Sequence, residues 1–128
     1  MSDFATLNDV IVLWRAVTPE EQTRIEALLP LVSDALRQEA LKVGKDLDSM
    51  VAENPILANV AKGVTVDVIS RTVNTSTTAE PMSQMSQSAL GYTVSGTYLV
   101  PGGGTLQILK NDLKRLGLKR QRIGIIDL

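Results

Sequence analysis

The strongest constraint on the fold is a helical pattern that starts at Thr18 and continues to Gly44. Thr18 can cap a helix, Pro19 suits the first helical position, and Glu21 completes a capping box. The apolar residues that follow recur at the spacing of one helix face: Ile25, Leu28, Leu29, Val32, Ala35, Leu36 and Val43. We therefore predict a long amphipathic helix that ends at Gly44. Pro30 should kink or divide it, because proline removes a backbone hydrogen bond and clashes with the preceding turn.

A second long helix is predicted from Pro55 to about residue 73, because Asn54 and Pro55 repeat the cap-then-proline start. Its apolar residues fall on two faces, the first with Leu57, Val60, Ala61, Val64 and Val68 and the second with Val66, Ile69 and Val73. A helix that is apolar on two faces is buried from two sides. We expect the second face to meet a neighbouring subunit. Alternating β-branched residues over 64–69 leave a strand there as an alternative.

Shorter elements are predicted on either side of these helices. A helix capped by Thr6 should run to about Trp14, and residues 46–53 have the composition of a polar connection. Residues 74–88 are rich in Ser, Thr, Asn and Gln and contain Pro81, which predicts a long polar loop.

The C-terminal part is expected to contain a β-hairpin, a helix and an arm. Alternating apolar residues over 89–100 predict two strands around a two-residue turn at Ser95-Gly96. Residues 105–116 have the spacing of a helix that ends at Gly117, with four residues turned inward: Leu106, Leu109, Leu113 and Leu116. Residues 119–128 are basic and then aliphatic, which predicts an extended arm or an edge strand.

These elements together predict one domain over residues 1–128, which is long enough to bury a modest core. Its class is mainly α, a small helical bundle with a protruding β-hairpin and an extended C-terminal arm. The helical bundle is assigned to residues 1–73, the polar loop and β-hairpin to 74–104, and the C-terminal helix and arm to 105–128.

The chain contains no histidine and no cysteine. This excludes disulfides, thiol chemistry, Ser-His-Asp catalysis and His-ligated zinc. Asp46 and Asp48 form a D-x-D pair, expected to be solvated because the glycine and further oxygen ligands of an EF-hand loop are missing. Gly102-Gly103-Gly104-Thr105 is expected to be a flexible turn, since a P-loop needs a lysine next. We expect no enzyme, cofactor or metal site, with Ser–Lys or carboxylate chemistry as the remaining alternative.

The formal net charge of −1 conceals an uneven distribution. Residues 1–54 carry ten acidic and five basic side chains, whereas residues 110–128 carry six basic and two acidic ones. A basic segment on an acidic body can bind nucleic acid, an acidic partner or the acidic end of a second copy. No aromatic residue lies in the basic run, so base-stacking platforms are missing there. We favour a protein partner over sequence-specific DNA binding.

Membrane insertion is not expected from the sequence. No apolar run approaches the roughly 18 residues that span a bilayer. The start Met1-Ser2-Asp3 is acidic where a signal peptide would be basic. We therefore expect no membrane partner, and a protein that is made and used on the cytoplasmic side or in a particle assembled there.

Several segments, taken in their order and spacing, point to one family. The N-terminal ones are Phe4-Ala5-Thr6, Asp9, Trp14-Arg15, Thr18-Pro19-Glu20-Glu21 and Leu28-Leu29. The C-terminal ones are Ser86-Gln87-Ser88, Tyr92, Gly96-Thr97-Tyr98-Leu99, Leu113 to Leu118, Arg120-Gln121-Arg122 and Ile126-Asp127-Leu128. In these segments the chain resembles the head–tail adaptor (connector) proteins of long-tailed bacteriophages. The resemblance covers nearly the whole chain apart from residues 40–55.

The resemblance implies a structural role in the virion. Such proteins form a homo-oligomeric ring, usually a dodecamer, beneath the portal protein at the capsid vertex. The ring extends the DNA channel, through which DNA passes without sequence specificity, and docks the stopper or tail completion protein. The implied fold is a small helical bundle with a hairpin and a C-terminal arm, and it favours a helix for residues 55–73.

Within such a ring, two groups of residues are expected to make the contacts. The subunit or portal interface is assigned to Val66, Ile69, Val73, Lys119, Arg120, Arg122, Ile123, Ile125, Ile126 and Leu128. The loop facing the channel or a partner is assigned to Thr77, Thr78, Ser83 and Gln84. Two other functions remain as alternatives: a small DNA-associated helical module that uses the basic C-terminal segment, and a small regulatory or inhibitor protein.

Overall fold

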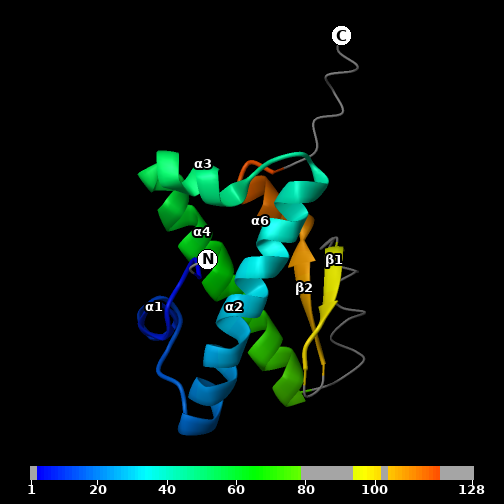
Figure 1. The fold of residues 1–128 in the computed structure, drawn as a ribbon. Helices are drawn as coiled ribbons and strands as arrows, with labels where there is room; N and C mark the ends of the chain where they lie inside the picture. The colour runs from blue at the N-terminus through cyan, green and yellow to red at the C-terminus, as the bar shows by residue number, and fades with distance from the viewer. Residues whose placement is uncertain (1–2, 79–93, 102–103, 119–128) are drawn as a thin grey trace.

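The computed structural model describes residues 3–78, 94–101 and 104–118. Its helices are α1 (Leu7–Leu13), α2 (Pro19–Lys42), α3 (Leu47–Glu53), α4 (Pro55–Thr78) and α6 (Lys110–Arg115). Two strands, β1 (Val94–Leu99) and β2 (Thr105–Leu109), form an antiparallel sheet (Figure 1). The predicted class is confirmed: the fold is mainly helical with a small β-hairpin. The predicted arm over residues 119–128 lies outside the described residues.

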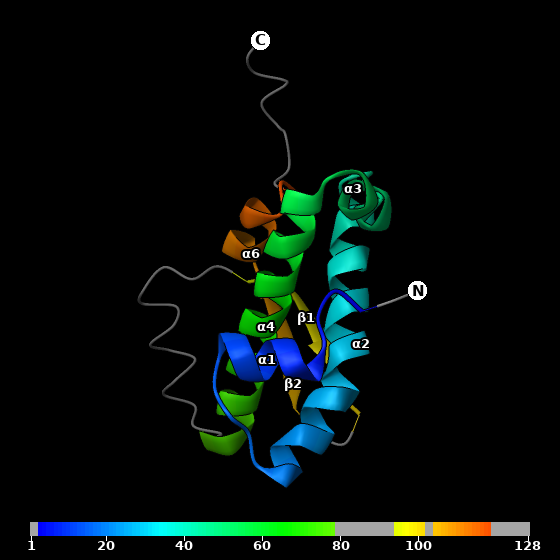
Figure 2. The same ribbon diagram turned by 90° about the vertical axis from the view of Figure 1, so that its left-hand side faces the viewer.

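The long helices α2 and α4 pack side by side and frame the domain (Figure 1). The hairpin lies on one side of this pair, and α1 crosses the pair on the opposite side (Figures 1 and 2). Helices α3 and α6 lie at the end where α2 finishes and α4 begins (Figure 1). The core fills the space between these elements, and its largest fully buried side chains include Ile25, Leu36, Ile69, Leu106 and Ile108.

Helix α2 begins where the sequence predicts. The Thr18 hydroxyl accepts a hydrogen bond from the Glu21 backbone N–H at 3.1 Å, and the Thr18 N–H donates to the Glu21 carboxylate at 3.0 Å. These reciprocal bonds satisfy two donors that the first turn would otherwise leave open. The helix stays a single element through Pro30, which is exposed, and Gly44 follows its end with a φ of 74°.

Helix α1 is also confirmed, and it uses the same kind of cap. The Thr6 hydroxyl accepts from the Asp9 N–H at 3.2 Å, and the Asp9 carboxylate accepts from the Thr6 N–H at 2.9 Å.

Among the described residues, no helix is long and apolar enough to cross a bilayer.

Helix α4 decides between the two predictions made for residues 55–73. It starts at Pro55, where the Asn54 side chain accepts from the backbone N–H of Ile56 at 3.1 Å, and it continues to Thr78. The strand alternative for residues 64–69 is therefore wrong. The loop assigned to residues 74–88 is also wrong for its first five residues, which complete the last turns of this helix.

The second apolar face of α4 lies inside the subunit. Val66, Ile69 and Val73 are 3%, 0% and 3% exposed, and they belong to the same core as Val64 and Val68 on the first face. These three residues were expected to meet a neighbouring subunit, but α2 and β2 of the same chain pack against α4. The domain is thus thick enough to cover both faces of its central helix.

Residues 46–53 form a helix rather than a polar connection. Asp46 caps α3, with its carboxylate accepting from the N–H of Asp48 at 3.1 Å and of Ser49 at 3.4 Å. Leu47 is 1% exposed and anchors this short helix to the core. The prediction was wrong because one buried leucine is too little periodicity to mark a helix in the sequence.

The hairpin turn and the start of the last helix both differ from the prediction. Ser95 and Gly96 lie within β1, and the chain turns between Val100 and Gly104, where the Val100 N–H donates to the Gly104 carbonyl at 3.1 Å. Gly104 has a φ of 84°, a conformation that other residues adopt only with strain. Residues 105–109 are strand, and the helix starts only at Lys110.

The four leucines expected to face inward are nevertheless all buried, at 1% to 7% exposure: Leu106, Leu109, Leu113 and Leu116. Leu106 and Ile108 reach the core by the two-residue alternation of a strand. Leu113 reaches it from helix α6, which Gly117 follows with a φ of 75°. The regular leucine spacing over residues 105–116 therefore gives no sign that the segment changes from strand to helix at Lys110.

Candidate interaction surfaces

A buried carboxylate fastens the hairpin to α2. Glu39 is 2% exposed, and its two oxygens accept hydrogen bonds from Ser95 Oγ at 2.8 Å, from Lys42 Nζ at 2.8 Å and from the Tyr98 hydroxyl. The register between the strands shifts between Val94 and Gly96, which makes Ser95 an extra residue in β1. Such a bulge re-aims side chains, and here Ser95 meets Glu39.

The electrostatics of this cluster follow from its donors. Burial on its own raises the pKa of the Glu39 carboxyl, but the hydrogen bonds from Lys42, Tyr98 and Ser95 outweigh burial and hold the pKa below its ordinary value. Burial, together with the hydrogen bond to Glu39 and its negative charge, raises the pKa of the Tyr98 hydroxyl. Glu39 is therefore an anchoring anion at neutral pH.

A second buried carboxylate holds the other strand and α6 against α4. Asp112 is 2% exposed and accepts from Arg71 Nη2 at 2.6 Å and from the Leu109 backbone N–H at 2.9 Å. Arg71 also donates to the Gln107 carbonyl at 3.2 Å. Arg71 thus links the second half of α4 to both β2 and α6, and these contacts fix the position of the hairpin.

Asp46 and Asp48 of the D-x-D pair both make contacts that stabilise the fold. Asp46 caps α3, and Asp48 accepts from Arg37 Nε at 3.0 Å. Arg37 also pairs with Asp34 at 2.7 Å and lies over the ring of Phe4, 4.6 Å from its centroid. Within the part of the chain that the structure describes, no group of three or more acidic side chains is arranged to hold a metal ion.

Gly102 and Gly103 of the glycine-rich segment lie outside the described residues, so the expected flexible turn stays a prediction. Thr105, which follows the segment, begins β2 rather than a helix. A phosphate cradle of the type considered needs a helix N-terminus after its glycines, and this segment has none.

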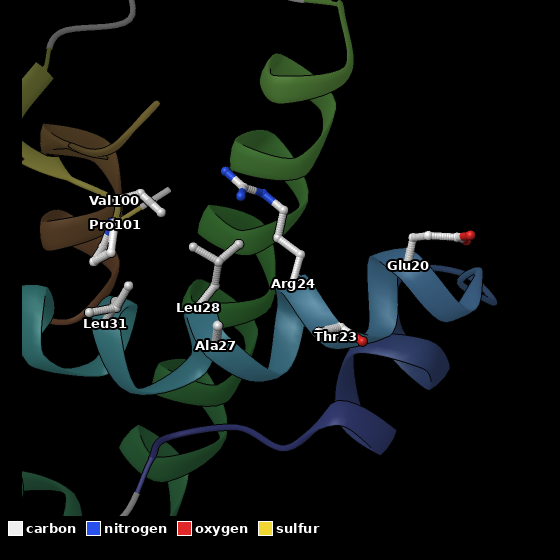
Figure 3. A pocket seen from close by; sticks show the side chains of 8 residues that line it. All are labelled: Glu20, Thr23, Arg24, Ala27, Leu28, Leu31, Val100 and Pro101. Atoms are coloured by element: carbon white, nitrogen blue, oxygen red, sulfur yellow. The ribbon is translucent and has the colours of Figure 1, made fainter. Parts of the chain in front are cut away.

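A groove follows α2 on the side of the hairpin. It consists of two open hollows of about 490 Å³ and 580 Å³, which meet at Leu31. The first lies between Leu28 and Leu31 of α2 and the turn residues Val100 and Pro101, as Figure 3 shows. The second lies between α2 and the β1 residues Gly96 to Leu99. We call this the α2–hairpin groove.

Large apolar side chains are exposed at several places, among them Leu41 and Ile56, and two further places are considered as contact surfaces. Leu99 of β1, beside the α2–hairpin groove, is 84% exposed. Ile11, Val12 and Leu13 form an exposed apolar run at the end of α1, of which Val12 is 69% exposed. Contiguous exposed apolar surface of this kind is typical of contact sites between proteins.

Helix α6 presents a basic surface. Lys110, Lys114 and Arg115 are exposed, and Arg115 also pairs with Asp67 of α4. Basic side chains near the end of a helix suit its negative pole, so this surface is compatible with both a solvated face and a contact with acidic groups.

The predicted contact residues fall into three groups. Val66, Ile69 and Val73 lie in the core. Thr77 and Thr78 lie in the last turn of α4, not in a loop. The remaining ones lie outside the described residues: Ser83, Gln84, Lys119, Arg120, Arg122, Ile123, Ile125, Ile126 and Leu128. The anchoring roles of Glu39 and Asp112 were not predicted, because a single acidic residue in a helical pattern gives no signal of burial.

A comparison with protein families gives a match over most of the chain. The family described as phage protein Gp19/Gp15/Gp42 matches residues 13–127. No match was found among curated proteins or among solved structures. The matched family is of the phage head–tail adaptor or connector type and is typically non-enzymatic, which agrees with the resemblance seen in the sequence. The chain therefore belongs to the phage protein Gp19/Gp15/Gp42 family and is a structural protein of the virion.

Proposed function

We propose that this protein is the adaptor of a phage head–tail joint. It forms a homo-oligomeric ring, a dodecamer, beneath the portal protein, extends the DNA channel and docks the stopper or tail completion protein. The observation that carries the proposal is the family match over residues 13–127. The protein acts by assembly rather than by catalysis, and DNA passes through the ring without sequence specificity.

The charge distribution and exposed apolar residues support a ring. A ring joins one surface of each subunit to a different surface of the next. The excess of acidic residues in 1–54 and of basic residues in 110–122 supplies groups of opposite charge. Val12 and Leu99 supply exposed apolar contacts from opposite sides of the α2–α4 pair. Complementary charge orients the encounter, and the apolar contacts add affinity.

The remaining assignments of the sequence analysis belong to this proposal. Residues 119–128, with Lys119, Arg120 and Arg122 ahead of four aliphatic side chains, reach the neighbouring subunit or the portal in the assembled ring. The segment that starts near Thr77 and includes Ser83 and Gln84 faces the channel or the tail-side partner. A polar segment with few charges would not hold passing phosphates.

The deciding experiment is a phage in which the gene for this protein carries a nonsense codon. We expect tailless heads that have packaged and then lost DNA, with rescue by the protein supplied in trans. We also expect the wild-type protein in purified virions at about twelve copies for each portal dodecamer, by quantitative mass spectrometry, as subunit-for-subunit stacking requires. Normal tailed virions from the nonsense phage would overturn the proposal.

The DNA-associated module is the second candidate, and exposed Lys110 and Lys114 favour it. It predicts that the isolated protein binds duplex DNA with an affinity that falls steeply with salt. The adaptor proposal predicts no such binding at physiological salt, so a fluorescence anisotropy titration separates the two functions.

A further inference from the structure

The α2–hairpin groove is an apolar surface with no occupant among the described residues. Its lining includes Leu28, Leu31 and Ala35 of α2 together with Leu99 and Val100 of the hairpin. Leu99 is 84% exposed, and Figure 3 shows Leu28 and Leu31 on the side of α2 that faces Val100 and Pro101. Leu28, Ala35 and Val100 are at most 7% exposed, so the apolar area that a covering segment would remove from water lies mainly on Leu31 and Leu99.

We propose that the C-terminal segment of the same chain, residues 119–128, occupies this groove in the free subunit and runs antiparallel to α2. The place where the segment begins supports this assignment. Leu118 is 0% exposed, and the Gly117 carbonyl accepts from Lys45 Nζ at 3.4 Å. Lys45 lies just beyond the end of α2, and Lys42 in the last turn of α2 lines the groove. The segment therefore starts at one end of the groove.

The length of the segment matches the length of the groove. Residues 119–128 in extended conformation cover about 33 Å, at about 3.3 Å per residue. The groove follows α2 from Lys42 back to Glu20, which is also about 33 Å at a rise of about 1.5 Å per residue. The segment is thus long enough to cover the whole groove.

The order of charged and apolar side chains along the segment also fits the groove. At this spacing Arg122 comes level with Asp34, which lines the groove and whose side chain is 69% exposed. At the same spacing Ile123 and Ile125 come level with Leu31 and Ala27 of the apolar stretch. Asp127 then comes level with the basic side chain of Arg24. Between Asp34 and Arg24 the groove runs from acidic to apolar to basic, which complements the basic, aliphatic and acidic order of residues 122–127, while Lys42 and Glu20 line its two ends.

This inference does not depend on the adaptor function. A segment that covers its own groove is not available to a neighbour, so docking within the subunit would keep the free protein monomeric with Leu99 covered. The test uses the full-length free protein and gives its answer whether or not the protein forms a ring.

The absence of cysteine makes a disulfide test clean. The groove pair Ala27→Cys with Ile125→Cys places both thiols level, since Ala27 lines the groove and is exposed. The control pair Val12→Cys with Ile125→Cys uses an exposed residue of α1, on the opposite side of the α2–α4 pair. Dilute protein is oxidised with diamide, and the intramolecular product is measured by non-reducing gel and by mass.

We expect the groove pair to close within the monomer at least about tenfold faster than the control pair, because docking raises the effective concentration of the second thiol. Equal closure rates for the two pairs would overturn the proposal. So would a product that is mainly a disulfide-linked dimer, which would assign the groove to the segment of a second copy.

A charge exchange gives an independent measurement in the same assay. Asp34→Lys should slow closure of the groove pair severalfold, because it places like charges level with one another. Adding Arg122→Glu to Asp34→Lys should restore the rate. Asp34 also pairs with Arg37, so the thermal stability of each variant is measured alongside. No slowing by Asp34→Lys, or no recovery in the double variant, would overturn the proposed register.

Discussion

Gly96 of β1 lies directly against the carboxylate of Glu39 in α2, so close that a β-carbon at Gly96 would collide with Oε2 of Glu39. The glycine is required for space, since the strand must approach the buried carboxylate closely enough for Ser95 and Tyr98 to donate to it. The residue allowed at position 96 of the hairpin therefore depends on the presence of Glu39 in α2.

Gly96→Ala should lower the free energy of unfolding by about 1–3 kcal/mol, the usual cost of an overpacked site. The matched control is Gly63→Ala in α4, where the added β-carbon would have as its nearest neighbour the flexible Arg115 side chain, at 3.4 Å. Alanine is favoured over glycine inside a helix by up to about 1 kcal/mol, so this control should be neutral or stabilising. The free energies of unfolding of Gly96→Ala and Gly63→Ala are measured in urea. Equal changes in the two variants would contradict the crowding at Gly96.

Glu39 should make part of the stability depend on acid. Its pKa in the folded protein lies below the ordinary value of 4.5. The folded state therefore favours the ionised form, so its contribution is complete above pH 4.5 and is lost as the pH falls through the lower folded value. Glu39→Gln cannot titrate. The difference in unfolding free energy between wild type and Glu39→Gln should shrink below pH 4.5, and a constant difference would contradict the assignment.

Tyr98 should make part of the stability depend on pH in the alkaline range. Its pKa is raised above 10.0 because burial and Glu39 disfavour the phenolate. Its stabilising contribution is therefore complete below pH 10 and is lost as the pH rises above it. Tyr98→Phe should cost about 1.5–3 kcal/mol at pH 7, as expected for a hydrogen bond to a charged group. The difference in unfolding free energy between wild type and Tyr98→Phe, measured by chemical unfolding, should become smaller above pH 10. Thr97→Ala, on the exposed side of β1, serves as the control.

The two aspartate–arginine pairs between α4 and α6 should differ in strength. Asp112→Ala removes a 2% exposed carboxylate and leaves Arg71 and the Leu109 N–H without it, which should cost about 2–4 kcal/mol. Asp67→Ala breaks the exposed pair with Arg115 and should cost less than about 1 kcal/mol. Thermal and urea unfolding measure both variants. A loss in Asp67→Ala as large as that in Asp112→Ala would show that burial does not decide the difference.

The exposed run on α1 should matter for assembly and not for folding. Val12→Glu changes a 69% exposed side chain and should leave the melting temperature within about 2 °C of wild type, as most surface substitutions do. Under the adaptor proposal it should lower joining of heads to tails at least tenfold in a complementation assay. Asn8→Glu, also exposed on α1, is the control for added charge. Normal joining with Val12→Glu would exclude this surface from the interface.

Local signals allowed much of the helical framework to be predicted. The caps at Thr6, Thr18 and Asn54 act within three residues of the helix they start, so they are visible in the sequence without knowledge of the fold. The same holds for the glycines that end α2 and α6, because their left-handed conformation satisfies the last turn. The family resemblance was also present in the sequence and is confirmed by the match over residues 13–127.

The elements that were wrongly predicted depend on distant partners. The leucine spacing over residues 105–116 fits a helix, but Leu106 pairs with Tyr98 across the hairpin, and this pairing makes the segment a strand. Burial of Val66 and Ile69 was predicted, but which elements bury them depends on where α2 and β2 pack. Neither outcome is encoded within a window of a few residues, so periodicity alone could not supply it.

The anchoring carboxylate Glu39 shows most clearly which features are determined by local sequence and which depend on the tertiary structure. The sequence by itself determined that Glu39 lies on a helix, since the caps and apolar spacing around it are local. Only the tertiary structure decided that Glu39 is buried and functions as an anchor, because Ser95 and Tyr98 stand 56 and 59 residues further along the chain. A charged side chain remains buried only where such donors converge on it, and that convergence is a property of the folded hairpin and α2 together.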